Sequence, residues 1–197
     1  MTYHGNYTIL TDADGVLLNW RDPFDAWMMR EKGIFAEGDV RVYDQADRYN
    51  MPDIFEYILN FNASANIGFL PPLYDSVKYV RKIHEEFGHK FTVITSLSLN
   101  PYAQELRTQN LKKIFGSEVF DEFVYLDTGE DKDDILLKYS EFYPGAYWIE
   151  DKIKNAIAGQ EVGLQPLLMK HPHIKTEDPK NIPLMPNWRA VYEQIGG

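Results

Sequence analysis

Short apolar runs alternate with amphipathic helical segments from Leu73 onward, and this alternation limits the fold more than any other feature. Strands are expected at about 6–12, 90–95, 123–126, 146–149 and 164–169, and helices at 74–87, 101–115, 131–139, from about 152, and at 188–195. Pro166 suggests that the last of these strands is an edge strand. Strands that alternate with helices form a parallel sheet with helices on both faces. The sequence therefore predicts the α/β class, as a three-layer, doubly wound parallel sheet.

The region 19–70 interrupts this alternation directly after the first strand. It contains helical patterns at 23–32 and 52–60, an irregular charged stretch at 36–48, and no strong strand pattern. We therefore expect a core domain made of residues 1–18 and 71–197, with residues 19–70 as a small helical insertion.

Composition and charge exclude several classes of protein. The chain has 197 residues, no cysteine and a net charge of −10. The absence of cysteine excludes disulfides, thiolate metal sites and a cysteine nucleophile. The negative charge argues against an extended nucleic-acid surface or binding to an anionic membrane, although a small anionic substrate remains compatible. No apolar run is long enough to span a bilayer, and the first residues lack the pattern of a secretory signal, so we expect a cytoplasmic protein.

The segment Asp12-Ala-Asp-Gly15 places two carboxylates directly after the first strand. In open α/β folds, ligands bind at the carboxyl ends of the strands. Asp12 and Asp14 are two positions apart, which puts their side chains on one face, and Gly15 allows the chain to turn. Two carboxylates this close repel each other unless a cation or a shared proton offsets the charge. The pattern favours a divalent-metal site with one nucleophilic carboxylate.

Three further groups of polar residues follow later strands, and a parallel sheet would bring them to the same edge. The hydroxyl groups of Thr95 and Ser96 end the second strand and could hold a phosphoryl oxygen. Lys132 begins the helix after the third strand and could neutralise carboxylate or phosphoryl charge. Glu150 and Asp151 end the fourth strand and could complete an oxygen-rich shell suited to magnesium.

In this order and context, the four motifs resemble those of the haloacid dehalogenase-like (HAD) superfamily of phosphohydrolases. The resemblance implies an α/β Rossmann-like core and a phosphatase. It implies that Asp12 attacks phosphorus to form an aspartyl-phosphate, and that Asp14 protonates the leaving oxygen and then activates water. Thr95, or alternatively Ser96, would bind the phosphoryl group, and Lys132 would neutralise it.

The same resemblance implies a magnesium ion as cofactor. Asp12, the Asp14 carbonyl and Asp151 would ligate the ion. Glu150 would support them, either by direct ligation or by holding the direct ligands, and the sequence leaves these two alternatives open.

The insertion at 19–70 is located where some members of this superfamily carry a cap over the site. Asp12-Ala-Asp-Gly-Val-Leu17, the 70–73 segment Leu-Pro-Pro-Leu and Ile94-Thr-Ser96 are similar to segments of the pyrimidine 5′(3′)-deoxyribonucleotidases. The pair Glu150-Asp151 departs from that pattern, which has two aspartates. This resemblance makes a nucleoside monophosphate the best single guess among small phosphate esters.

The aromatic side chains Trp20, Phe24 and Trp27 could bind substrate by stacking on a base, or could pack the insertion onto the core. His171 and His173 are expected to be exposed in a proline-rich loop rather than to bind metal.

Two other functions are consistent with the motifs. One is a phosphatase of nucleic-acid 3′-phosphate ends, and the other is a catalytically silent binding protein with the same fold. The sequence does not indicate an oligomeric state.

Overall fold

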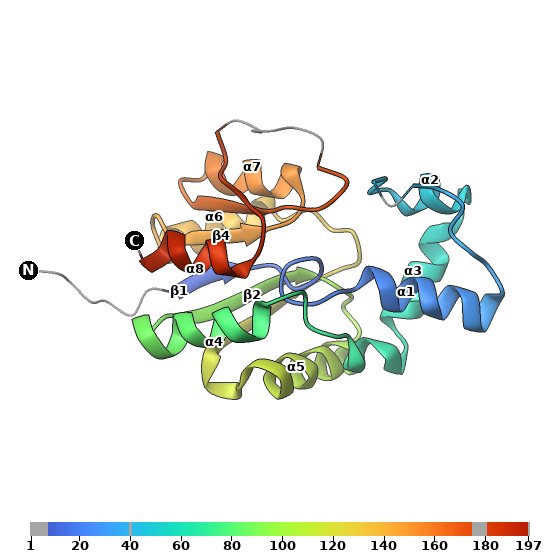
Figure 1. Cartoon of the computed structure of the whole chain (residues 1–197), viewed down its shortest axis with the longest axis horizontal. Coiled ribbons are helices and arrows are strands. Elements are labelled where there is room, and N and C mark those ends of the chain that lie inside the picture. Colours follow the sequence, from blue (N-terminus) through green and yellow to red (C-terminus); the bar gives the residue numbers. More distant parts are fainter. Residues whose placement is uncertain (1–7, 40, 175–180, 197) are drawn as a thin grey trace, which may run out of the picture.

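Six strands form one parallel sheet in the computed structural model, which describes residues 8–39, 41–174 and 181–196 (Figure 1). The strands are β1 (Thr8–Thr11), β2 (Lys90–Ser96), β3 (Phe120–Leu126), β4 (Tyr147–Glu150), β5 (Gln165–Met169) and β6 (Leu184–Met185). Their spatial order is β3-β2-β1-β4-β5-β6, with every neighbouring pair parallel. The chain therefore builds the sheet outward from β1 first in one direction and then in the other.

Helices cover both faces of this sheet. They are α4 (Ser76–Phe87), α5 (Pro101–Phe115), α6 (Asp133–Phe142), α7 (Ile153–Glu161) and α8 (Trp188–Gly196), with a 3-10 turn, η3 (Ser117–Val119), before β3. Helices α4, α5 and α8 lie on one face, and α6 and α7 lie on the other (Figure 1). This arrangement confirms the predicted doubly wound α/β fold.

The burial of β1 on both faces explains why its two central residues, Ile9 and Leu10, are both apolar. Ile9 packs into the apolar cluster that includes Val80, Leu111 and Trp188. Leu10, whose side chain points the opposite way, packs into the cluster formed with Leu136 and other residues of the α6 and α7 layer. A strand covered on both sides gains burial from every residue, so it shows no alternation of apolar and polar side chains.

Two details of the sheet differ from the prediction. The strand β6 falls in a segment expected to be a proline-rich loop, because two residues are too few to give a strand pattern. Because β6 lies outside β5, β5 is not the edge strand that Pro166 suggested. The pairing with β6 begins only at Leu168, however, so Pro166 has a paired neighbour only in β4, where its missing N–H is tolerated.

The segment between β1 and α4 is helical. It contains α1 (Arg21–Trp27), the π-helix η1 (Met28–Lys32), α2 (Gln45–Tyr49), α3 (Ile54–Asn62) and the 3-10 helix η2 (Ala65–Phe69). These helices lie to one side of the sheet, beyond the carboxyl end of β1 (Figure 1). Helix α2 falls partly within the stretch expected to be irregular. It is only five residues long and is capped by Asp44, whose side chain accepts a hydrogen bond from the Ala46 N–H at 2.7 Å.

Helix α8 ties the far end of the chain to the loop after β1. The Trp188 Nε1–H donates to the Val16 carbonyl at 2.8 Å, and the Trp188 side chain is fully buried. Asp75 accepts from the backbone N–H groups of Trp188 and Arg189, which satisfies two of the unpaired donors at the start of the helix. Among the helices in the described ranges, none combines the length and the hydropathy needed to cross a membrane.

We expect Trp188→Ala to lower the free energy of unfolding by about 3–5 kcal/mol, because it leaves a large cavity and removes a buried hydrogen bond. Urea unfolding followed by circular dichroism measures this change. Phe142→Ala is the control, since Phe142 is 65% exposed, and it should change the stability by less than about 0.5 kcal/mol. Equal effects for the two variants would contradict the anchoring role of Trp188.

Candidate active site

The polar residues after β1 and β4 meet where the direction of strand order reverses. β1 and β4 are neighbours in the sheet, and the Asp12 N–H donates to the Ile149 carbonyl at 2.9 Å. The connections from these two strands leave toward opposite sides, which opens a crevice at their carboxyl ends. Asp12 follows β1, and Glu150 ends β4 directly before Asp151. All three carboxylates are buried at this crevice.

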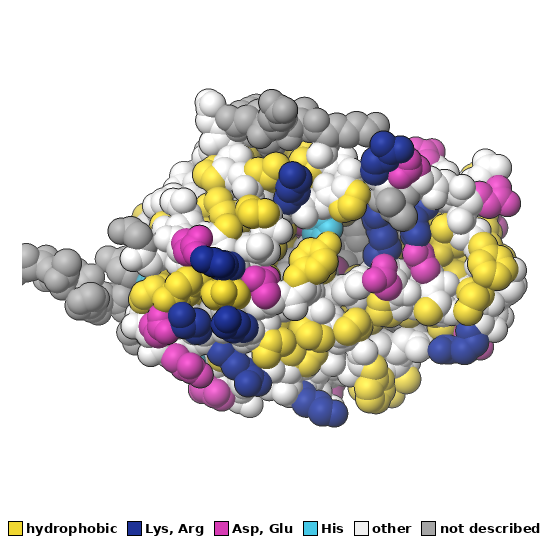
Figure 2. All heavy atoms as spheres, viewed as in Figure 1, with side chains coloured by type: hydrophobic (Ala, Val, Ile, Leu, Met, Phe, Trp, Pro, Cys, Tyr) yellow, Lys and Arg dark blue, Asp and Glu magenta, His cyan; other side chains and the backbone are white. Residues whose placement is uncertain are grey.

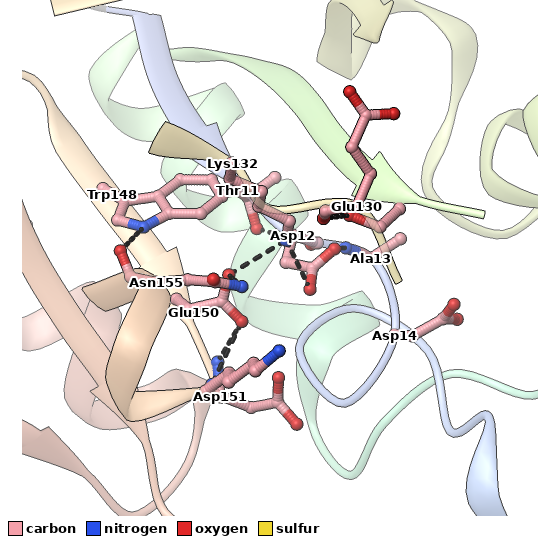
Figure 3. A network of polar contacts seen from close by, with 12 residues as sticks. Thr11, Asp12, Ala13, Asp14, Glu130, Lys132, Trp148, Glu150, Asp151 and Asn155 are labelled. Atoms are coloured by element: carbon pink, nitrogen blue, oxygen red, sulfur yellow. Dashed lines mark hydrogen bonds and ion pairs between the residues drawn. The ribbon is translucent and has the colours of Figure 1, made fainter. Parts of the chain in front are cut away.

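Lys132 joins the carboxylates of the two strands (Figure 3). Its Nζ lies 2.8 Å from Asp12 Oδ2 and 2.9 Å from Glu150 Oε2, and its side chain is 2% exposed. The ammonium group also lies 5.1 Å from the centre of the Trp148 ring. Burial alone would lower the pKa of Lys132, but the Asp12 and Glu150 carboxylates outweigh burial and raise it. The lysine is therefore a fixed positive charge of the site.

Glu150 has both carboxylate oxygens engaged within the protein. Its Oε1 accepts from the backbone N–H groups of Asp151 and Lys152, and its Oε2 accepts from Lys132 and Asn155. A carboxylate offers about four lone-pair positions, so four donors use its whole capacity. The site residue Glu150 thus holds its neighbours in place, which favours the supporting alternative over direct metal ligation.

Asp12, Glu150 and Asp151 form an acidic group, in which one oxygen of each carboxylate lies within 4.8 Å of the others. Three carboxylates against one ammonium group leave two negative charges uncompensated, which is the charge of one divalent cation. Burial, followed by the negative charge of Glu150, raises the pKa of Asp12 to about 7 despite Lys132, and the same two causes raise the pKa of Asp151. Hard oxygen ligands with excess negative charge are the donor set that magnesium prefers, so the residues fit this ion.

Asp14 lies apart from this group. Figure 3 shows its carboxylate pointing away from Asp12, Glu150 and Asp151. Its Oδ1 accepts a hydrogen bond at 2.7 Å from Nη1 of Arg107, a residue of helix α5. Arg107 was not identified from the sequence, although the position of this residue in its helix is unusual. It follows Ala103 and precedes Leu111 on the buried face of the helix, where a charged residue is unusual.

The two hydroxyl residues at the end of β2 differ in their contacts. Thr95 is buried near the carboxyl end of β2, two positions beyond Val93, which pairs with Thr11 of β1. The Ser96 hydroxyl donates to the Glu130 carbonyl at 2.8 Å. Because that donor is already used, Thr95 is the better candidate for binding a phosphoryl oxygen.

The three aromatic residues proposed to stack on a base all lie in the 19–70 segment. Phe24 is completely buried and contacts Trp20, Trp27 and Phe61, with ring centres 4.6 to 6.2 Å apart. Trp27 is 8% exposed. Trp20 is partly buried, and its Nε1–H donates to Asn62 Oδ1 at 2.9 Å. These contacts favour the packing alternative, in which the residues form the core of the segment.

The expectation that His171 and His173 are exposed is wrong. The His171 side chain is 14% exposed, and its Nε2 lies 2.6 Å from the Gly15 carbonyl and 4.0 Å from Asp151 Oδ2. His173 stacks on His171, and Tyr43 of the 19–70 segment packs on His173, with ring centres 5.4 and 4.7 Å apart. Burial, followed by His171, lowers the pKa of His173 to about 4, so its ring is neutral at pH 7.

These contacts join the 19–70 segment to the core beside the acidic group. Burial, followed by the negative charges of Asp151, Glu150 and Asp12, raises the pKa of Tyr43. Figure 2 shows a hollow between the two parts of the molecule, with histidine surface visible in it and Lys or Arg side chains beside it. Sequence alone gave no sign of Tyr43, because its stretch has no regular pattern.

Comparison with known proteins establishes the fold. No family model matches the chain, and no curated protein matches its sequence. A haloacid dehalogenase-like family hydrolase from Streptococcus pneumoniae is 12% identical, with 96% of this chain and 98% of that chain covered and a TM-score of 0.67. A D,D-heptose 1,7-bisphosphate phosphatase from B. bronchiseptica, solved with magnesium and phosphate, is 14% identical, with 96% and 97% covered and a TM-score of 0.60. An L-2-haloacid dehalogenase is 13% identical, with 97% and 99% covered and a TM-score of 0.62. The predicted likeness to the haloacid dehalogenase-like superfamily is thus confirmed at the level of the fold.

Gly15 lies against the acidic group, and its replacement tests how tightly the loop packs. Its φ is +76°, and an added Cβ would lie 2.2 Å from Asp151 Oδ2. We expect Gly15→Ala to displace Asp151 and to lower the free energy of unfolding by about 1–3 kcal/mol. Gly163→Ala is a matched control, with φ +85° and no atom within 4 Å, and it carries only the backbone cost. Equal losses in chemical denaturation would show that Gly15 does not touch Asp151.

The raised pKa of Asp12 predicts a pH-dependent response to magnesium. The ordinary value of 3.8 rises to about 7 in the folded chain, so the metal-free fold loses stability as pH rises from about 4 to 7. A bound cation relieves this repulsion but has to displace a proton at lower pH, which weakens its apparent affinity by about tenfold per pH unit below 7. The increase in Tm caused by magnesium should therefore grow from pH 5 to pH 8, as measured by scanning calorimetry. A pH-independent increase, or one retained in Asp151→Asn, would contradict the assignment.

Proposed function

We propose that this chain, which has the haloacid dehalogenase-like fold, is a magnesium-dependent phosphomonoesterase acting on a small phosphate ester through an aspartyl-phosphate. The observation that carries the proposal is the buried group of Asp12, Lys132, Glu150 and Asp151 at the point where strand order reverses. It combines a carboxylate nucleophile, a fixed positive charge and an excess of two negative charges. Phosphoryl transfer depends mainly on such positioning and charge neutralisation.

The residues divide the reaction into two displacements. In the first, an oxygen of Asp12 bonds to phosphorus, the bond from phosphorus to the leaving oxygen breaks, and Asp14 donates a proton to that oxygen. In the second, water attacks the phosphoryl group, Asp14 accepts the proton from water, and the bond to Asp12 breaks to release phosphate. Lys132 keeps Asp12 in place and offsets charge on the phosphoryl oxygens, while Thr95 donates a hydrogen bond to one of them.

Asp12 and Asp151 would hold the magnesium ion, with the Asp14 carbonyl as a further ligand implied by the family resemblance. When bound, the ion neutralises the phosphoryl group and reduces its repulsion by the carboxylates. Glu150 accepts hydrogen bonds from Lys132 and from the N–H group of Asp151, so it would keep the donor set in position without ligating the ion.

The 19–70 segment supplies the part of the proposed site that selects the substrate. Its contact with the core through Tyr43 and His173 supports a cap that closes over the hollow and limits the entry of water. A cap of this kind favours a small, detached phosphate ester over the end of a nucleic acid. Within this class a nucleoside monophosphate is our first candidate. Because Trp20, Phe24 and Trp27 pack in the core of the segment, base recognition would fall to Tyr43, which is 45% exposed.

The decisive experiment measures phosphate release from p-nitrophenyl phosphate and from a panel of nucleoside monophosphates, sugar phosphates and 3′-phosphorylated oligonucleotides. We expect release only with magnesium, and a loss of at least about 10³-fold in kcat for Asp12→Asn, because the nucleophile is removed. Glu130→Gln is a control near the site whose side chain accepts from the Asp127 N–H, and it should retain activity.

Other results would identify other functions. Faster release from oligonucleotides than from any small ester would favour the nucleic-acid alternative. Halide release from a 2-haloacid without phosphate release would indicate a dehalogenase. A folded protein that neither binds magnesium nor hydrolyses any ester would support the silent binding protein.

A further inference from the structure

Helix α5 places a fully buried cation behind the carboxylate that handles the proton in the proposed reaction. The Arg107 side chain is 0% exposed, and its Nη1–H donates to Asp14 Oδ1 at 2.7 Å. We propose that Arg107 is a positioning residue that fixes the orientation of Asp14 for proton transfer to the leaving group. This inference rests on the proposed function, because it assigns Arg107 a role through Asp14.

The burial of Arg107 is not explained by packing. A guanidinium group removed from water needs a counter-charge and hydrogen-bond acceptors. In the described part of the chain, Nε and Nη2 of Arg107 have no hydrogen-bond partner. Asp14 supplies the counter-charge, and the Asp14 side chain is 25% exposed. An apolar side chain would fill the same volume without leaving N–H groups unsatisfied, so the pair with Asp14 is the main gain from an arginine here.

The direction of the pair suits a positioning role. Asp14 is two positions from Asp12, and its carboxylate could turn toward the acidic group or away from it. It points away from that group (Figure 3), and its Oδ1 is paired with Arg107 Nη1. Arg107 itself is carried on a 15-residue helix whose buried face packs into the core. The ion pair therefore favours one rotamer of Asp14 before the substrate binds, and in our proposal this rotamer is the one that transfers the proton.

If Arg107 positions the proton donor, its loss should slow the hydrolysis of some substrates more than that of others. Phosphorus–oxygen cleavage to an alkoxide needs protonation of the leaving oxygen, whereas a dinitrophenolate leaves readily without a proton. Misplacing Asp14 should therefore slow hydrolysis of alkyl phosphates and spare that of 2,4-dinitrophenyl phosphate. The parameter kcat/KM separates this effect from the later hydrolysis of the aspartyl-phosphate, because it reports only the steps up to formation of that intermediate.

The experiment compares kcat/KM for glycerol 2-phosphate and for 2,4-dinitrophenyl phosphate in wild type, Arg107→Met and Arg107→Lys. We expect Arg107→Met to lose about 10²-fold on the alkyl ester and no more than about threefold on the aryl ester. Arg107→Lys keeps the charge but not the forked geometry, so it should recover part of the loss on the alkyl ester. It also serves as the test variant if Arg107→Met does not fold.

Two controls separate positioning from a general structural effect. Arg48 pairs with Asp25 in the 19–70 segment with similar exposure, 6% and 27%, so Arg48→Met removes a comparable ion pair without touching Asp14. Its effect should be equal on the two esters. In an Asp14→Asn background, Arg107→Met should cause no further loss on the alkyl ester, because the residue through which Arg107 acts is already altered.

Equal losses on the two esters, or an undiminished effect of Arg107→Met in the Asp14→Asn background, would overturn the positioning role while leaving the proposed function intact. A wild type that hydrolyses neither ester would instead overturn the proposed function, and this inference with it.

Discussion

The ammonium group of Lys132 is the charge on which the arrangement of the site depends. It lies within hydrogen-bond distance of Asp12 and Glu150, and so connects the ends of two adjacent strands with one buried ion. Without it, three carboxylates would share a crevice from which water is largely excluded, at a high electrostatic cost. With it, a double negative charge remains, which protons or a divalent cation can offset. The same residue therefore permits burial of the acidic group and leaves the group able to bind metal.

Much of the fold could be predicted because local patterns and tertiary structure agree. The helix at 101–115 is found with the same bounds, since Asn100, Pro101 and Gly116 mark its ends independently of the rest of the chain. The parallel sheet followed from the alternation of strands and helices, and this alternation also brought Asp12, Thr95 and Asp151 to one edge. What the sequence could not supply were elements without a pattern of their own, such as the two residues of β6.

The parts of the site that escaped prediction are contacts between distant segments. Arg107 is 93 positions from Asp14, and His171 is 156 positions from Gly15. A single sequence contains no signal for such pairs beyond an unusual residue on an apolar face. Tyr43, His171 and His173 come from a loop and a proline-containing stretch, where composition says little about burial. The aromatic residues of α1 show the converse: their type suggested a ligand surface, whereas their packing makes them the core of the segment.

The central position of β1 has a consequence for the order of folding. This first strand pairs with β2 and β4, and the loop after it is held by Trp188, which is 172 positions from Val16. Contacts at such separation form late, because a long stretch of chain has to be closed before they gain any energy. The loop that carries Asp12 and Asp14 cannot reach its final hydrogen bonding before α8 docks. During synthesis on a ribosome, these two aspartates emerge well before Trp188, and they acquire their final surroundings only after it.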